Sequence, residues 1–405
     1  MTTARVPVRD TYDAQVDLLP RDGVARSAFG VLKRTYRITT RGLEVGAPSP
    51  LRDPLRGPAP GSGWLWPHGS DLWPLKDATD VVVEGFAWAV GGRPVTEVRC
   101  GVRVGRRRKI ACVRGRRRVE GTSRRPRIGP PEPFVRVALD AAHAYGGIDR
   151  AVRDPDAEPL RAALGHPGAY PRNPLGKGYR VAALGPGEEL ELPEVEDPAD
   201  PLTIERLVTR DPRRWVHQPL PWTFGWQPAH HFVRSHLLGF RPYYPVSTAA
   251  ALPEVARGLL PPDVLSRARR ALAGEAPEPL FFREASLGLS FAPPLGPGTP
   301  IEVTGMHPER ARLAFTVPPP PAMVLGVEGQ AEAVETRILH VVIHPHDERV
   351  TFTWAGIRWD LPRAFLPGLH GEIPLWMTID GDRPLRYATP RPVRATVGAA
   401  EREAG

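Results

Sequence analysis

The chain has 405 residues, among them 40 glycines and 50 prolines. Each proline inside a helix costs about 3 kcal/mol, so this composition excludes a helical bundle or a coiled coil. The formal net charge is +9, and two cysteines are too few for a disulfide-stapled secreted scaffold. Because no run of about 18 apolar residues and no signal-peptide core are visible, we expect a soluble, cytoplasmic protein without a membrane partner.

The positive charge is concentrated in one segment. Between Arg103 and Arg127, twelve arginines and lysines stand against a single acid, Glu120, so the rest of the chain is close to neutral. Such a patch attracts an acidic protein, an anionic surface or nucleic acid, although a solvated arginine-rich loop has the same composition. No aromatic residues are interleaved to stack bases, which disfavours nucleic acid.

The first half of the chain contains clear strand patterns. Residues 29–43 are rich in β-branched and aromatic side chains, and residues 80–90 are apolar at nearly every position, as in a strand buried on both faces. Between residues 96 and 104, apolar side chains alternate with polar or small ones. The apolar face resumes after a turn, which predicts a hairpin centred on Arg106.

The predicted hairpin brings the two cysteines together. Centring on Arg106 places Cys100 opposite Cys112 and Val102 opposite Ile110 on the inward face. Cross-strand neighbours lie about 4.5–5.5 Å apart, so a disulfide is sterically feasible, but a cytoplasmic location favours two buried thiols. The arginines would then lie at the tip of the hairpin and along its outer face.

The second half alternates loops with short strands. Residues 154–201 are loop-rich and end in an acidic segment, and the pattern of residues 262–273 predicts a helix capped near Asp263. Residues 339–354 predict a hairpin whose side chains at Leu339, Val341 and Ile343 face one way. The fold class is therefore mainly β, a β-sandwich-like architecture of many short strands and long Pro/Gly loops with a small inserted helical segment.

We expect three regions along the chain. Residues 1–226 form an N-terminal β-rich region that carries the arginine-rich hairpin. Residues 227–280 form a divergent insertion with the helix. Residues 281–405 form a C-terminal β-rich region that ends in a polar tail.

The usual catalytic and nucleotide-binding motifs are missing from the sequence. His340 and His344 lie about 13 Å apart along a strand, too far to share one zinc ion. His344 and His346, about 6.6 Å apart, allow either a metal site or solvated turn histidines. A second group, His230, His231 and His236, lies among aromatic residues and allows packing, a ligand site or a partner contact. We predict no enzyme activity, no cofactor and no metal.

Several segments carry a family resemblance through their order along the chain. They are residues 71–80 (DLWPLKDATD), Val104 and Gly105 with Lys109, residues 113–115 (VRG), 144–147 (AYGG), 173–178 (NPLGKG), 192–196 (LPEVE), 292–294 (APP), 305–308 (GMHP) and the pair Thr353 and Trp354. This order resembles the domain-of-unknown-function family 2169, found beside bacterial type VI secretion spike genes. The resemblance covers roughly residues 20–358.

The resemblance implies a cytoplasmic adaptor or chaperone that helps to load PAAR-tipped effectors onto a VgrG-type spike, without known catalysis. The chain departs from the family at residues 115–119, where GRRRV replaces a Gly-Asp-Arg-x-Trp run, and in the divergent residues 227–280. These departures concern the identity of the partner more than the class of protein. The alternatives are a structural component of a related contractile injection particle and a metal or carboxylate hydrolase.

Two sets of residues are candidates for function. The first set would contact a partner and consists of Arg106, Arg107, Arg108, Lys109, Arg116, Arg117, Arg118, Trp64, Trp66, Trp222 and Trp226. The second set consists of family-motif residues with a structural role, Asp71, Lys76, Asp80, Tyr145, Gly146, Gly147, Asn173, Pro174, Gly176 and Gly178. We expect the first three of these to pair or cap at a strand entrance, and the glycines to take positive φ or allow close backbone approach.

Overall fold

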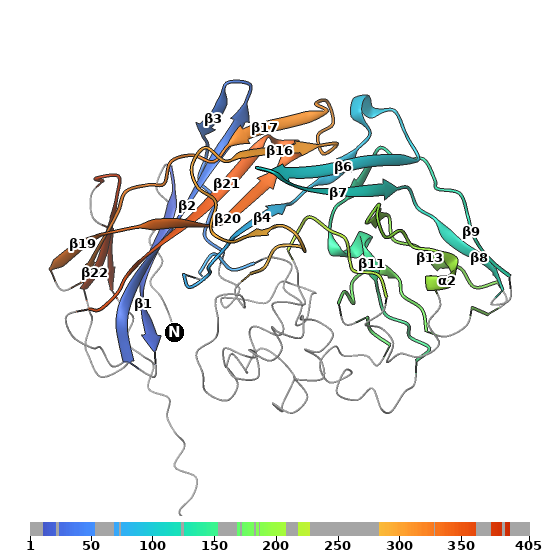
Figure 1. The fold of residues 1–405 in the computed structure, drawn as a ribbon, viewed down its shortest axis with the longest axis horizontal. Coiled ribbons are helices and arrows are strands. Elements are labelled where there is room, and N and C mark those ends of the chain that lie inside the picture. Colours follow the sequence, from blue (N-terminus) through green and yellow to red (C-terminus); the bar gives the residue numbers. More distant parts are fainter. Residues whose placement is uncertain are drawn as a thin grey trace, which may run out of the picture.

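The protein is described by a computed structural model. It covers residues 11–21, 24–52, 69–72, 74–122, 125–152, 168–170, 172–181, 184–185, 187–207, 218–226, 283–327, 329–361, 374–382 and 385–388. Strands dominate this part of the chain (Figure 1), which confirms the mainly-β prediction. Its helical elements are short: α2 (Ile204–Leu207), η2 (Val90–Gly92), η3 (Ala141–His143) and η8 (Pro345–Asp347). The predicted helix at 262–273, the histidines 230, 231 and 236, and both Trp64 and Trp66 lie outside the described residues.

The centre of the molecule is a seven-stranded sheet in the order β1-β2-β21-β20-β4-β15, with β3 paired to β2 off this path. Its strands are β1 (Asp13–Arg21), β2 (Val24–Thr39), β3 (Gly42–Val45), β4 (Thr79–Val83), β15 (Ser290–Phe291), β20 (Thr336–His344) and β21 (Arg349–Arg358). The β20–β4 pair is parallel and the other pairs are antiparallel. This central sheet therefore joins strands from both ends of the sequence (Figure 1).

Two further sheets pack beside the central one. The five-stranded sheet has the order β14 (Val195–Glu196), β7 (Arg107–Arg114), β6 (Glu97–Val104), β16 (Pro300–Thr304) and β17 (Arg312–Thr316). The four-stranded sheet has the order β19 (Gln330–Val334), β18 (Met323–Val327), β22 (Pro374–Ile379) and β23 (Leu385–Ala388).

Three small sheets complete the described part of the chain. They are the three-stranded sheet β13 (Leu190–Glu191), β8 (Arg118–Thr122) and β9 (Arg125–Ile128), and the pairs β10 (Arg136–Ala138) with β5 (Phe86–Trp88) and β11 (Tyr145–Gly146) with β12 (Lys177–Gly178). No described helix has the length and apolarity needed to cross a bilayer.

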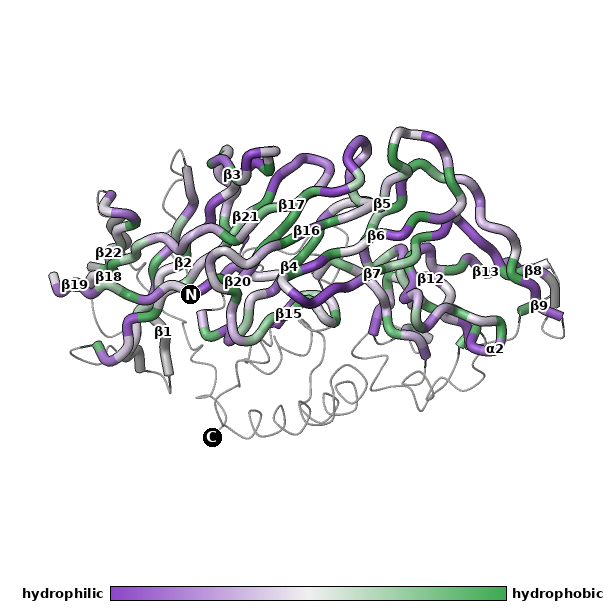
Figure 2. Tube along the Cα trace, turned by 45° about the horizontal axis from the view of Figure 1, so that its top comes forward, coloured by the Kyte–Doolittle hydropathy of each residue, from purple (hydrophilic) through white to green (hydrophobic). Residues whose placement is uncertain are grey.

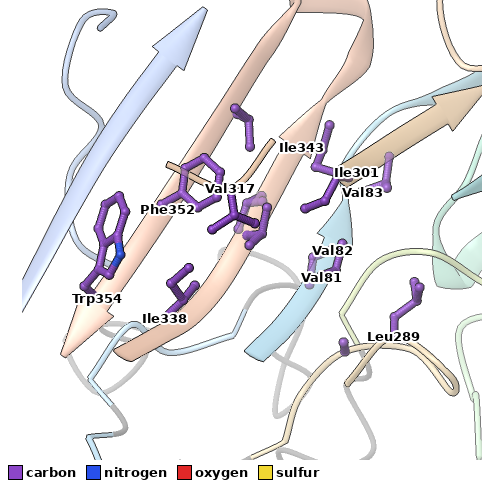
Figure 3. Close-up of a cluster of buried hydrophobic side chains, with 14 of the residues drawn as sticks. Val81, Val82, Val83, Leu289, Ile301, Val317, Ile338, Ile343, Phe352 and Trp354 are labelled. Atoms are coloured by element: carbon purple, nitrogen blue, oxygen red, sulfur yellow. The ribbon is translucent and has the colours of Figure 1, made fainter. Parts of the chain in front are cut away.

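One apolar core lies between the central sheet and its two larger neighbours. Phe315 of β17 meets Phe352 of β21 at a ring distance of 6.4 Å, and a Cβ on Gly30 of β2 would lie within 2.8 Å of side chains from β18 and β22. Figure 3 shows Phe352 and Trp354 projecting from β21 into this core beside Ile338. Figure 2 shows apolar residues along β4, β16 and β17 and hydrophilic ones near β9 and β19 at the ends. The architecture is thus sandwich-like, with close sheet-on-sheet packing.

The first predicted hairpin forms, but its register differs from the prediction by one residue. The turn contains only Gly105 and Arg106, so Cys100 pairs with Ala111, and Cys112 pairs with Arg99. Gly105 adopts a φ of +55°, which glycine accepts without strain and which permits the shorter turn. A shift of one residue moves every side chain of β7 to the opposite face.

The shifted register separates the two cysteines. Cys100 and Cys112 are both buried, free and on opposite faces of the hairpin. Burial raises the pKa of Cys100 to about 12 and that of Cys112 to about 11, so both are unreactive thiols at neutral pH. Lys109 takes a place on the inward face instead and is 5% exposed.

The second predicted hairpin also forms, with one interruption. β20 and β21 pair as expected from Val341–Phe352 to Ile343–Val350, but a bulge places both Leu339 and His340 opposite Thr353. Leu339 therefore joins a small cluster on the other face of the sheet instead of the face shared by Val341 and Ile343. Strict alternation cannot reveal the extra residue of a bulge.

Candidate functional site

A row of polar side chains crosses the central sheet. The strand register places one polar residue from each of six neighbouring strands in line, namely Asp13, Lys33, Thr353, His340, Asp80 and Ser290. The first five of these residues are at most 2% exposed. A polar row at this depth needs hydrogen-bonding partners, since each unpaired buried polar group costs roughly 1–3 kcal/mol.

Asp71 supplies one set of these partners from the segment that precedes β4. Its carboxylate accepts hydrogen bonds from Lys33 Nζ at 2.6 Å, from Thr353 Oγ1 at 2.9 Å and from the backbone N–H of Arg52 at 2.6 Å. His340 Nδ1 faces the same carboxylate at 3.5 Å. The segment 71–80 is therefore attached to both β2 and β21.

Lys76 lies at the centre of a second set of contacts. Its Nζ is 2.7 Å from Asp80 Oδ2, 2.5 Å from His340 Nε2 and 3.6 Å from Glu284 Oε2. All four side chains have no exposed surface. An ammonium carries three donors, and here each of them has an acceptor close by.

Glu284 and Asp80 are held by further groups. The Glu284 carboxylate accepts from the backbone N–H of Ser70, and its own backbone N–H donates to Asp80 Oδ2 at 2.5 Å. The hydroxyl of Ser290 donates to the other oxygen of Asp80. The ring of Trp226 covers His340 edge-on at 5.1 Å. We call Lys33, Asp71, Lys76, Asp80, Glu284 and His340 the ionic cluster.

Burial and neighbouring charges shift the pKa values of the ionic cluster in opposite directions. Burial alone would raise the pKa of Asp71, but the charge of Lys33 and the contact with His340 outweigh it and hold this pKa well below its usual range. Burial lowers the pKa of Lys33, and the Asp71 charge opposes that shift. The charges of Lys33 and Asp71 therefore support one another against the cost of burial.

Three members of the ionic cluster have the geometry of a metal site. One ligand atom each from Asp80, Glu284 and His340 lies within 4.8 Å of the other two. The Lys76 ammonium, however, stands among these same atoms and supplies the positive charge that a cation would bring. The chain therefore provides its own cation, and the residues present do not fit a metal ion as long as Lys76 keeps this position.

The arginine-rich segment divides into a free tip and a neutralised base. Arg106, Arg107 and Arg108 are exposed at the β6–β7 turn, and Arg107 lies over the ring of Phe291 at 5.5 Å. Arg108 pairs directly opposite Arg103, whose guanidinium is bound to Glu302 at 2.8 Å. Like charges placed opposite one another destabilise a strand pair, and Glu302 reduces this repulsion because it compensates the charge of Arg103.

The arginines at the base bind acids of the same chain. Arg116 pairs with Glu191 at 2.7 Å, Arg117 with Glu196 at 2.8 Å and Arg118 with Glu189. Arg114 also contacts Glu97 and Glu196. The acidic segment predicted as a loop thus neutralises this half of the patch, and Arg117 is buried at 7% exposure.

Three further members of the first predicted set, Lys109, Trp222 and Trp226, are buried or half-buried. Lys109 points inward, donates to the carbonyl of Leu287 and stands 4.3 Å above the Trp222 ring. Trp222 is half-buried and donates to the carbonyl of Ile110. Trp226 is buried and donates to Glu84 at 2.7 Å. These three side chains support the fold, contrary to the expectation of exposed aromatic anchors.

The motif residues of the second predicted set occupy two places. Asp71, Lys76 and Asp80 enter the ionic cluster. The others build a tight crossing of two loops: the Asn173 side chain donates to the carbonyls of Ala141 and Tyr145, and the Tyr145 hydroxyl donates to Gln218. Gly146, Gly147 and Gly178 have φ of +152°, +114° and +92°.

Gly176 is the remaining glycine of that crossing, and the close approach of another backbone segment explains why a glycine is needed there. A Cβ on Gly176 would lie 2.4 Å from the carbonyl oxygen of Ala144, which no side chain tolerates. Pro174 beside Asn173 is buried. The described glycines and Asn173 of this crossing serve backbone packing.

Sequence patterns do not reveal Lys33 and Glu284 as members of the ionic cluster, and they suggest His340 only as a possible metal ligand. Lys33 and His340 each interrupt an apolar strand, which is the one signal that the sequence offers for them. Glu284 directly follows the divergent insertion and has no pattern around it. Strand pairing over more than 200 positions brings these residues together, as with Lys76 and His340.

Comparison with known proteins identifies one matching family. The family model described as "Uncharacterized protein conserved in bacteria (DUF2169)" matches residues 28–355. The chain belongs to this family. The match extends from β2 to β21 and so includes all six residues of the ionic cluster. Searches among curated proteins and solved structures give no significant match.

Proposed function

We propose that the protein is a non-enzymatic adaptor of the bacterial cytoplasm that binds a PAAR-type effector and helps to load it onto the VgrG-type spike of a type VI secretion system. The exposed tip of the β6–β7 hairpin is the observation that carries the proposal. Its arginines 106 and 108 extend beyond the core on a two-residue turn and point to an acidic partner surface.

The rigidity of the base supports this role. β6 pairs with β7 on one side and with β16 on the other, so the tip stands on the middle of a five-stranded sheet. Arginines held in place lose less conformational entropy on binding than those on a free loop. Arg116, Arg117 and Arg118 are bound to acids of the same chain, so they contribute little to the charge that a partner would meet near the tip.

The ionic cluster supports a structural role in place of catalysis. Lys76, Asp80, Glu284 and His340 have no exposed surface, and the acceptors around the ammonium face inward. A substrate would have to displace Lys76 to reach them. The cluster instead attaches the 71–80 segment to the central sheet.

Charge reversal at the tip tests the proposal. The variant Arg106→Glu/Arg108→Glu leaves Arg107 on Phe291 and should keep the unfolding midpoint of the wild type. We expect its affinity for the PAAR-type protein encoded beside it to fall about tenfold or more in calorimetry, because attraction becomes repulsion.

The matched control is Arg125→Glu/Arg127→Glu, two exposed arginines of the same basic segment on β9. It changes the net charge equally and should bind like the wild type. If both variants lose the same affinity, the net charge of the protein explains the effect and the position of the arginines does not. If the tip variant binds like the wild type, the tip is not part of the interface. Failure of the wild type to co-purify with either a PAAR-type or a spike protein would refute the proposed function itself.

A further inference from the structure

A cavity lies beside the ionic cluster on the same face of the central sheet. It measures about 210 Å³ and is lined by Lys33, Ser49, Pro50, Arg52, Val342, His344, Arg349 and Thr351. Since a water molecule takes roughly 30 Å³ of liquid, the cavity has room for about seven waters or for a small organic ligand.

Three neighbouring strands form the floor of the cavity. Thr351 of β21 is in register with Val342 of β20, and Lys33 of β2 lies one row away. These three residues are each 2% exposed. The wall is the segment that follows β3 and contributes Ser49, Pro50 and Arg52.

The lining of the cavity is basic and polar. All ionisable side chains among the described lining residues are bases, and Ser49 and Thr351 add hydroxyl groups. Two of these bases already have fixed partners behind the wall. Lys33 is bound to Asp71, and Arg52 makes a bidentate pair with Glu84 at 2.6 and 3.0 Å. Both guanidinium and ammonium are thereby locked in position at the edge of the cavity.

Arg349 is the lining base with donors to spare. Its Nε is buried and makes no hydrogen bond, and its closest acid in the described chain is Asp347, at 3.5 Å from Nη2. Its side chain is 41% exposed, so it also lies at the mouth of the cavity. The two Nη groups at the end of a guanidinium present a parallel pair of donors that matches a carboxylate, and the Asp347 contact of Nη2 is a long one.

His344 adds a neutral polar group opposite Arg349. The two residues are paired across β20 and β21. Burial lowers the pKa of His344 to about 4, and the nearby Glu84 only partly offsets this effect. The imidazole is therefore uncharged at neutral pH and does not add to the charge that a ligand would meet.

We propose that this cavity is a binding site for a small carboxylate ligand, either a free dicarboxylate or the carboxyl terminus of a peptide. The Arg349 guanidinium receives the carboxylate through its Nη groups, and the Ser49 hydroxyl, which accepts a hydrogen bond from Thr35, donates to a polar atom deeper in the cavity. Lys33 and Arg52 stay with their own acids and supply the positive lining. This proposal stands on the cavity alone and is independent of the adaptor function.

Succinate is the probe for a free dicarboxylate, and an uncharged-side-chain tripeptide with a free carboxyl terminus is the probe for a peptide source. Binding is followed by calorimetry and by the ¹⁵N signal of the arginine Nε–H groups. We expect saturable binding of at least one probe, with one Nε–H signal shifted strongly. That signal should be missing in Arg349→Gln, and the affinity of this variant should fall tenfold or more.

Arg310→Gln is the matched control, because the Arg310 side chain is 40% exposed, near the 41% of Arg349, and binds Glu348 outside the cavity. It should bind like the wild type. Arg349→Lys keeps the charge without the paired donors and replaces Arg349→Gln if the latter does not fold; its affinity should also fall. Binding of inorganic phosphate without succinate or tripeptide, no binding of any probe, or equal binding by the Arg349 variants would overturn the proposal.

Discussion

Lys76 holds together three acceptors that would otherwise repel one another or remain unpaired. Its Nζ stands between Asp80, Glu284 and His340, which have no access to water. A buried ion pair contributes little net stability, but removing one partner leaves an uncompensated buried charge. The ionic cluster thus adds little net stability, but the loss of any one of its charges should destabilise the fold strongly.

Replacement of Lys76 by methionine tests this condition. We expect Lys76→Met to lower the free energy of unfolding by about 3–5 kcal/mol, since two carboxylates lose their buried counter-charge. The control Lys177→Met breaks a pair with Glu194 in which the lysine side chain is 26% exposed, so water can replace part of the lost charge and the cost should be smaller. Urea unfolding followed by tryptophan fluorescence measures both. Similar stabilities of the two variants would contradict the role of the ammonium.

Part of the ionic cluster could be predicted from the sequence and part could not. Asp71, Lys76 and Asp80 lie within one short segment, so a local pairing was predictable, and Lys76 does bind Asp80. Lys33 and Glu284 join them only through the pairing of strands far apart in the chain. Local pattern carries no information on such pairings, because the partner strand decides which polar residues meet.

At the level of elements, alternation predicted the strands better than their register. The β6–β7 and β20–β21 hairpins both exist, yet a two-residue turn shifts the first and a bulge at Leu339 interrupts the second. Each of these differences changes the alignment of the two strands by one residue. Period-two patterns define which residues share a face within a strand, whereas turn length and bulges determine how two strands are aligned.

The register shift has a measurable consequence at Lys109. It brings this lysine to the inward face, where burial lowers its pKa to about 7. A lysine in the unfolded chain titrates at about 10.4. Between these two pH values the unfolded state binds more protons than the folded state, so this group makes stability rise with pH.

Lys109→Met removes that titration. From pH 7 to pH 10, the free energy of unfolding of the wild type should rise relative to that of the variant by an amount on the order of a few kcal/mol. The Trp222 ring, 4.3 Å below the ammonium, favours its charged form and reduces the effect without changing its sign. Urea unfolding of both proteins across this pH range is the measurement. Parallel stability curves would show that Lys109 titrates normally.

At the level of the whole molecule, the two ends of the sequence build one structure. In the central sheet, β2 pairs with β21 and β4 with β20, and in the five-stranded sheet β6 pairs with β16. Each of these pairs joins a strand from residues 1–226 to a strand from residues 281–405. The ionic cluster follows the same arrangement, because Lys76 binds His340 and Asp71 binds Thr353.

This interleaving predicts the behaviour of the chain when it is divided between residues 250 and 251. Fragment 1–250 alone would leave β4 without both of its neighbours, β20 and β15, and β2 without β21. Fragment 251–405 alone would leave His340 without Lys76 and Asp80. We therefore expect neither fragment to show cooperative unfolding by itself. Co-expressed fragments should co-purify in a one-to-one ratio and unfold in a single transition, since three of the six strand pairs of the central sheet join one fragment to the other. The co-expressed pair carrying Lys76→Met should associate more weakly than the pair carrying Lys177→Met. A cooperative thermal transition of fragment 1–250 alone, measured by circular dichroism, would show instead that the N-terminal region is an independent domain.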